Sequence, residues 1–233
     1  GVTTGAEIRN TKMPKVTFKF DKEKDLHNIW QTATSSSEWH DFRKNVTPNI
    51  VAMCKGKKFD DCKKELDNLM QHVYKTGLIE SYIVGLKDAW GKIEKEYFRR
   101  MDKIMKKKFS KDIIGYITTS GRCPYDPKEP SFMVSLFYSL PHSLATCGHE
   151  IMHLYFHEFY WEDVEKKIEK EKTGDLKEAL TELLNSEFRD LWVIDDYGYE
   201  PHKKLREFIS KTWKKEKDFD VLLEKCVEWL KDK

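Results

Sequence analysis

The sequence predicts an α+β fold that is predominantly helical, with a small sheet packed on one central helix. Amphipathic patterns of helical period cover most of the 233 residues. Three short segments are instead rich in β-formers or alternate between apolar and polar residues, namely Val16–Phe20, Ile113–Thr118 and Phe132–Tyr138. The run from Ser143 to His157 combines an apolar stripe with a polar face, which predicts a buried helix that packs on these strands.

Composition argues against several kinds of partner. The 42 lysine and arginine residues nearly balance 40 aspartate and glutamate residues, so nucleic acid is not expected as the main partner. No apolar run approaches the roughly 20 residues of a membrane span. The 5 cysteines are scattered and odd in number, which predicts reduced thiols and a cytoplasmic location. A removed signal peptide stays open, because the chain begins at Gly1.

Residues 1–110 are expected to form a helical N-terminal lobe of one domain, since no repeat or low-complexity linker interrupts the chain. After the first strand, helical patterns follow at about 22–33, 35–55, 59–75 and 78–108. The last pattern is the longest, and its apolar and aromatic positions recur at helical spacing. Such a stripe indicates core packing rather than a cofactor site.

Residues 111–233 are expected to carry the functional half. A loop dense in turn residues separates the second and third strands at 120–127. Ser143 can cap the next helix, which is expected to run to about Trp161. After a charged connection broken at Thr173-Gly174, a helix over 175–191 is predicted, followed by helices at about 201–213 and 218–231.

The strongest motif lies in the central helix, where His149-Glu150 is followed after two residues by His153. Histidines at i and i+4 lie on the same face of a helix, so both imidazoles can reach one metal ion. Glu150 follows the first histidine and is placed to act as the general base of a metal-dependent hydrolase. The motif therefore predicts one bound Zn²⁺.

The third protein ligand that a catalytic zinc site needs is not given by the helix itself. His157 lies two turns from His149, about 12 Å along the axis, which is too far to share the ion. Phe156 and Phe159 stand where a metzincin would have a glycine and a third histidine. The acids of the following helix remain as candidates: Glu178, Glu182 and Glu187.

Over roughly residues 112–200 the chain resembles the gluzincin metallopeptidases, the thermolysin-like group that pairs a His-Glu-x-x-His helix with a glutamate on a later helix. Glu178, followed by Ala179, matches the position of that glutamate. The resemblance implies that His149, His153 and Glu178 bind one zinc ion. It also implies that Glu182, one turn later, orients a zinc histidine, although Glu182 and Glu187 stay rival ligands.

The resemblance also implies further roles around the site. Gluzincins bind substrate along a sheet edge before the His-Glu helix, where Phe132–Tyr138 is expected. They stabilise the oxyanion with a downstream histidine or tyrosine, for which His202, Tyr197 and Tyr199 are available, with Asp196 to orient His202. The chain departs from the pattern at Lys177, where the family has asparagine, and it is much shorter.

Two functions follow as expectations from the sequence. The first is a zinc peptidase that uses Glu150 as general base to hydrolyse a peptide or protein substrate. The alternative is a zinc-containing binding or scaffold protein with an occluded or inactive peptidase-like site, because the N-terminal lobe has no catalytic motif. Neither function requires nucleic acid or a membrane, and the oligomeric state stays open.

Overall fold

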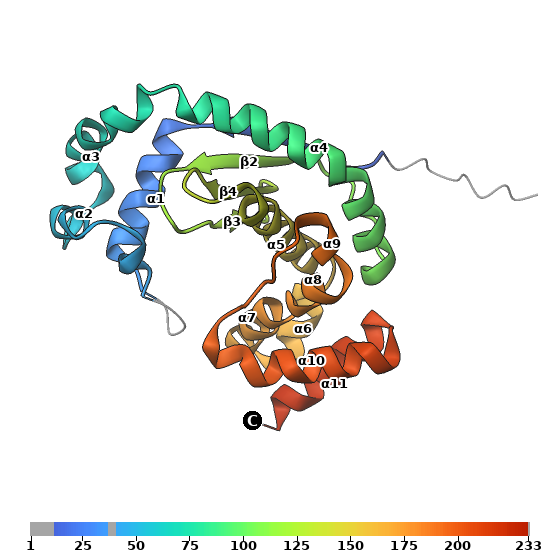
Figure 1. Cartoon of the computed structure of the whole chain (residues 1–233). Coiled ribbons are helices and arrows are strands. Elements are labelled where there is room, and N and C mark those ends of the chain that lie inside the picture. Colours follow the sequence, from blue (N-terminus) through green and yellow to red (C-terminus); the bar gives the residue numbers. More distant parts are fainter. Residues whose placement is uncertain (1–11, 37–40, 233) are drawn as a thin grey trace, which may run out of the picture.

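The computed structural model describes residues 12–36 and 41–232, and it confirms an α+β fold in which helices surround a small sheet (Figure 1). Eleven helices, two 3₁₀ turns and four strands are found in this part of the chain. In chain order they are β1 Val16–Phe20, α1 Lys22–Thr34, η1 Phe42–Asn45, α2 Pro48–Cys54, α3 Phe59–Tyr74, α4 Leu78–Met105, β2 Ile113–Thr118, β3 Tyr125–Asp126, β4 Ser131–Ser135, α5 Leu140–Phe159, α6 Trp161–Ile168, α7 Lys170–Ala179, α8 Glu182–Glu187, α9 Arg189–Trp192, η2 Glu200–His202, α10 Lys203–Glu216 and α11 Phe219–Lys231.

The sheet has the strand order β1-β2-β4-β3. β1 and β4 both pair with β2 in parallel, whereas β3 pairs with β4 antiparallel. All three predicted strands are present, but β4 ends at Ser135 and the chain then turns, with the Tyr138 amide donating to the Ser135 carbonyl at 3.2 Å. The fourth strand, β3, was not among the predicted strands, since its two residues are too few to show a period.

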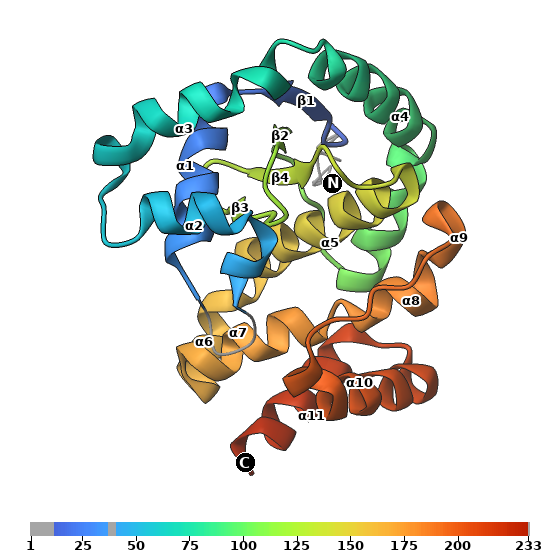
Figure 2. The same ribbon diagram turned by 60° about the vertical axis from the view of Figure 1, so that its left-hand side comes forward.

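Two apolar cores hold the elements together. The main core joins α4, the sheet, α5 and the C-terminal helices, and both views place α5 between the sheet and α6–α11 (Figures 1 and 2). A smaller core joins α1, α2 and α3. Within the described ranges, no helix has both the length and the apolar character needed to cross a membrane.

Helix boundaries differ from the predicted ones between residues 35 and 55 and at the start of α5. The predicted helix at 35–55 is a 3₁₀ turn followed by the short α2, and residues 37–40 lie outside the described part. Pro48 takes the first turn of α2, where its missing N–H costs nothing. α5 begins at Leu140, so Ser139 rather than Ser143 caps it, with the His142 amide donating to the Ser139 hydroxyl.

The helix predicted over 175–191 is instead three helices, α7, α8 and α9. The break before α7 falls at Glu169, which adopts a φ of 69°, and not at Thr173-Gly174. Thr173 lies inside α7, where its amide and its hydroxyl both donate to the Glu169 carbonyl, at 3.0 and 2.6 Å. As a result Glu178 lies near the C-terminal end of α7 rather than in a first turn.

Candidate metal centre

Two helices bring three possible ligands together. His149 and His153 lie one turn apart on α5, and their Nε2 atoms are 3.5 and 3.4 Å from the Oε2 atom of Glu178 on α7. The three ligand atoms all lie within 4.8 Å of one another. This buried group fits the His-Glu-x-x-His plus glutamate arrangement and could hold one metal ion.

Burial on α7 explains why Glu178 points inward. Its neighbours Leu176, Ala179 and Leu180 are buried in the main core, so this part of the helix has no solvent-facing side for the carboxylate. α7 ends there, and the Thr181 hydroxyl donates to the Glu178 carbonyl at 2.7 Å. The exposed fraction of Glu178 is only 8%.

The second carboxylate oxygen of Glu178 is bound by its neighbour in the chain. Lys177 Nζ lies 2.7 Å from Glu178 Oε1 and also donates to the Tyr125 hydroxyl at 2.9 Å. Burial alone would raise the pKa of Glu178, but His153, His149 and Lys177, which surround its carboxylate, hold that pKa well below its usual range. Glu178 is therefore an anion with one oxygen directed at the imidazoles.

His149 is oriented by Asp196. The His149 Nδ1 atom lies 2.5 Å from Asp196 Oδ2, and because a carboxylate only accepts, Nδ1 carries the proton and Nε2 faces Glu178. Asp196 is itself held by the Thr181 hydroxyl at 3.0 Å and by Arg206 at 3.1 Å. Although burial opposes it, His149 and Arg206 lower the pKa of Asp196 to about 2.

His153 is held by packing rather than by a polar partner. It is 2% exposed, and its ring lies 5.0 Å from that of Tyr125. Its Nδ1 atom is buried and has no hydrogen-bond partner among the described residues. Burial and the charge of Lys177 lower the pKa of His153 to about 3, so the imidazole is neutral, the form that binds a metal.

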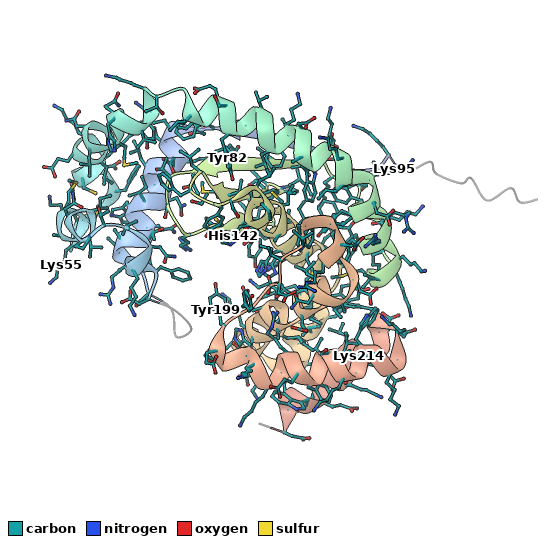
Figure 3. The ribbon with its side chains drawn as sticks, in the orientation of Figure 1. Lys55, Tyr82, Lys95, His142, Tyr199 and Lys214 are labelled. Carbon is teal, nitrogen blue, oxygen red and sulfur yellow. The ribbon has the colours of Figure 1, made fainter. Side chains whose placement is uncertain are left out.

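Glu150 lies beside the three ligands in the wall of a cavity of about 920 Å³. Burial raises the pKa of Glu150 to about 8, against the opposing charge of His149. The cavity is lined by α5, the loop between β2 and β3, the end of α7 and residues 194–199, and Phe42 and Asn45 of η1 contribute from the N-terminal lobe. In Figure 3, His142 of α5 and Tyr199 lie on opposite sides of this space.

Three other residues named from the sequence have partners outside the ligand group, namely Glu182, Glu187 and His202. Glu182, expected to orient a zinc histidine, instead contacts Arg206 at 3.0 Å and Asn185 at 3.2 Å. Glu187 contacts the Trp213 indole at 2.6 Å. His202 does not line the cavity, because it is buried against α7 with its Nε2 atom 3.0 Å from Asp175.

Asp196, Tyr197 and Tyr199 were also named from the sequence. Asp196 was expected to orient His202, but the structure places it against His149. Tyr197 and Tyr199 both line the cavity; Tyr197 is 86% exposed and Tyr199 is partly buried.

The strand expected to bind substrate is not at the sheet edge. β4 lies between β2 and β3, so both of its sides are paired at Ser131 and Phe132. The edge nearest the ligands is β3 with the loop before it, and Tyr125 of this strand lines the cavity. A substrate strand along Phe132–Tyr138 is therefore not supported.

Three residues of the site were missed from the sequence. Lys177 adjoins Glu178, yet a lysine beside a glutamate in a charged segment has no distinctive pattern. Tyr125 stands in a turn-rich loop. Arg206 lies 10 residues after Asp196 on α10 and fixes it with Thr181, a contact that only the fold produces. No local pattern could have found Arg206.

Comparisons with family models, with curated proteins and with solved structures give no match to this chain. The class of site therefore rests on the geometry of His149, His153 and Glu178 alone.

Proposed function

We propose that this protein is a zinc-dependent peptidase. The observation that carries the proposal is the convergence of two imidazoles and one carboxylate on α5 and α7, with a second, buried carboxyl at Glu150 in the wall of the same cavity. Structural zinc sites use four protein ligands, whereas catalytic sites use three and leave one position open. The described residues supply three, which favours catalysis.

Zinc suits this donor set. Two imidazole nitrogens with one carboxylate form a ligand set typical of catalytic zinc, whereas magnesium and calcium take oxygen ligands almost exclusively. The Asp196 carboxylate on Nδ1 of His149 fixes which nitrogen is presented to a metal. When bound, zinc supplies Lewis acidity that activates water and polarises a carbonyl.

Glu150 is assigned the proton transfers. With a pKa raised to about 8 by burial, it can take a proton from the attacking water and pass it to the leaving amine near neutral pH. Its wall position keeps it beside the ligands without adding its oxygens to the ligand group. The same carboxyl thus acts as base and then as acid.

Tyr199 is the best-placed oxyanion donor among the downstream residues. Its side chain lines the cavity, and burial together with the charges of Glu178 and Glu150 raises the pKa of its hydroxyl, so the hydroxyl stays protonated. Tyr197 is a more exposed candidate at the same wall. His202 is a weaker candidate because it does not line the cavity and instead contacts Asp175.

The test compares the parent with Glu150→Gln. Both proteins are expected to bind one zinc per chain by mass spectrometry, while only the parent cleaves a peptide library, and a chelator abolishes that cleavage. Glu158→Gln, an acid at the end of α5 that pairs with Lys111 on the surface, is the matched control and should retain activity. Equal cleavage by Glu150→Gln would disprove the mechanism.

A zinc-containing binding protein is the second candidate. Phe42 and Asn45 show that the N-terminal lobe reaches the cavity, so it can restrict access as well as bind a substrate. Full zinc occupancy with no cleavage of any library peptide by the intact chain would favour this alternative over the peptidase.

A further inference from the structure

Arg122 is a charged residue of the cavity that the proposed reaction does not use. It lies in the loop between β2 and β3, which passes beside α1 in Figure 1, and its side chain lines the cavity that contains the metal ligands. Its backbone is fixed on both sides: the Arg122 carbonyl accepts from Asn28 at 2.9 Å, and its amide donates to the Ser120 hydroxyl at 3.3 Å. These two hydrogen bonds therefore fix the backbone of Arg122 at the cavity.

The guanidinium is held by neutral groups. Its Nη1 atom donates to the Gln31 side-chain oxygen at 3.1 Å, and its carbon lies 5.3 Å from the centre of the Phe42 ring. No carboxylate of the described ranges lies within the 4.0 Å of an ion pair with Arg122. Partly buried guanidinium groups usually have such a partner, because burying an unpaired charge is costly.

The rest of the cavity explains why the missing anion should come from a ligand. Lys177, the other lysine or arginine of the described lining, is already paired with Glu178 at 2.7 Å. The charges of Glu150 and Arg122 influence each other, yet Glu150 makes no ion pair with it within the described residues. Arg122 thus presents planar N–H donors, suited to a carboxylate, in the cavity where the reaction would occur.

We propose that Arg122 binds a carboxylate of the substrate, either its C-terminal α-carboxylate or an acidic side chain, while the scissile bond lies at the metal ligands. This inference rests on the proposed peptidase function and adds its substrate class. A cavity of about 920 Å³ is large enough for a short peptide segment that reaches from the ligands to Arg122. If the α-carboxylate is the group bound, the enzyme removes residues from peptide C-termini.

The experiment measures binding and cleavage separately with three N-acetylated peptides of the same length. One has a free C-terminal carboxylate, one is its C-terminal amide, and the third is an amide with one glutamate near its end. Binding is measured by calorimetry on the zinc-loaded, full-length Glu150→Gln protein, with and without Arg122→Gln. Cleavage of the same peptides is measured with the zinc-loaded parent.

The peptide that carries the recognised carboxylate should bind about 10- to 100-fold more tightly than the plain amide, the range expected for a charge-assisted hydrogen bond. Arg122→Gln should remove this preference. Tight binding of the glutamate amide would identify a side-chain carboxylate as the group recognised, and tight binding of the free acid alone would identify the α-carboxylate. Equal binding of all three peptides, a preference that survives Arg122→Gln, or no binding of any peptide would overturn the inference.

Failure of this inference and failure of the peptidase proposal give different results. Equal cleavage of all three peptides keeps the peptidase and removes the role of Arg122. Carboxylate-selective binding that needs Arg122, without cleavage by the parent, keeps that role and removes the peptidase.

Two further variants separate recognition from folding and charge. Arg122→Lys keeps the charge but loses the planar donors, so an intermediate preference is expected in a protein that melts like the parent. Arg43→Gln removes the same charge from an arginine already paired with Asp41 at 2.7 Å, and it should leave the preference unchanged.

Discussion

Glu178 and Asp25 are both buried carboxylates, but their donors differ in charge. Oε2 of Glu178 faces two imidazoles at 3.4 and 3.5 Å, and Lys177 holds the other oxygen. Asp25 of α1 is fully buried and accepts four hydrogen bonds of 2.6–2.8 Å, all from neutral groups of Thr118, Thr119 and Tyr74. One carboxylate lies among ionisable groups, and the other among hydroxyls and an amide.

This difference separates a ligand from a structural residue. Burial raises the pKa of Asp25, and its donors join α1 to the end of β2 and to α3. All its hydrogen bonds are internal, so it has no need of an ion. Glu178 remains ionised, with an oxygen directed at two metal-binding nitrogens. Burial of an acid is therefore not enough to indicate a metal site; the nature of its donors decides.

Removing the Asp25 carboxylate should have the largest effect on stability. Asp25→Ala leaves a buried amide and three hydroxyls without their acceptor, and we expect the free energy of unfolding to fall by about 3–4 kcal/mol. Zinc per folded chain should not change. Denaturant unfolding and metal analysis check this, and loss of zinc from the folded variant would show that the two sites are coupled.

Removing the charge of Glu178 should have the next largest effect, on the metal. Glu178→Gln keeps the shape of the side chain but loses the anionic ligand, so zinc affinity should fall by more than the about 10- to 100-fold typical of residues that only orient ligands. Competition with a chelator measures the affinity. Zinc binding as tight as in the parent would exclude Glu178 as a ligand.

Asp196→Asn should weaken zinc less, by about 10- to 100-fold, because His149 keeps its place but loses the carboxylate that fixes its tautomer. Glu182→Gln is the matched control: that side chain contacts Arg206 and Asn185, not a histidine, so zinc affinity should be nearly unchanged. A larger loss in Glu182→Gln than in Asp196→Asn would reverse the roles that the structure gives them.

The predictable parts of this molecule are those encoded within a few residues. The alternation in Val16–Phe20 and the i, i+4 histidines of α5 depend only on local periods, and both were found. The pairing of Glu178 with the histidines came from resemblance to a family, because the 24 residues between His153 and Glu178 give no spacing rule. The structure brings the three residues together.

What was missed depends on tertiary contacts. The left-handed backbone at Glu169, a residue without special preference for it, moved the helix break away from Thr173-Gly174. Asp196 contacts His149, which lies 47 positions earlier in the chain. The sequence around Asp196 does not distinguish it from the acid of an ordinary turn. Arg122 could be recognised as a candidate binding residue only from the fold, which shows that its neighbours are neutral.

The smallest predicted effect on stability comes from Asp25→Asn, which removes the charge of the Asp25 side chain but keeps its shape. In Asp25→Asn, one oxygen can still accept from Thr118 and the Thr119 amide, while the new NH₂ faces the hydroxyls of Thr119 and Tyr74, which can rotate to accept. The cost should be about 1 kcal/mol in the free energy of unfolding. A cost near that of Asp25→Ala would mean that these hydroxyls cannot turn.

The pH dependence of that small cost tests why Asp25 differs from Glu178. Burial raises the pKa of Asp25 above its usual 3.8, so the folded protein binds this proton more readily than the unfolded chain does. The contribution of this proton to the free energy of unfolding is fully present below pH 3.8 and is lost as pH rises through the pKa of Asp25 in the folded protein. Asparagine does not titrate, so Asp25→Asn has no such pH dependence. The stability advantage of the parent over Asp25→Asn should therefore shrink as the pH rises above 3.8, measured by denaturant unfolding. An advantage that grows with pH would mean that neutral donors hold Asp25 ionised as firmly as the imidazoles and Lys177 hold Glu178, and charge would no longer distinguish the two sites.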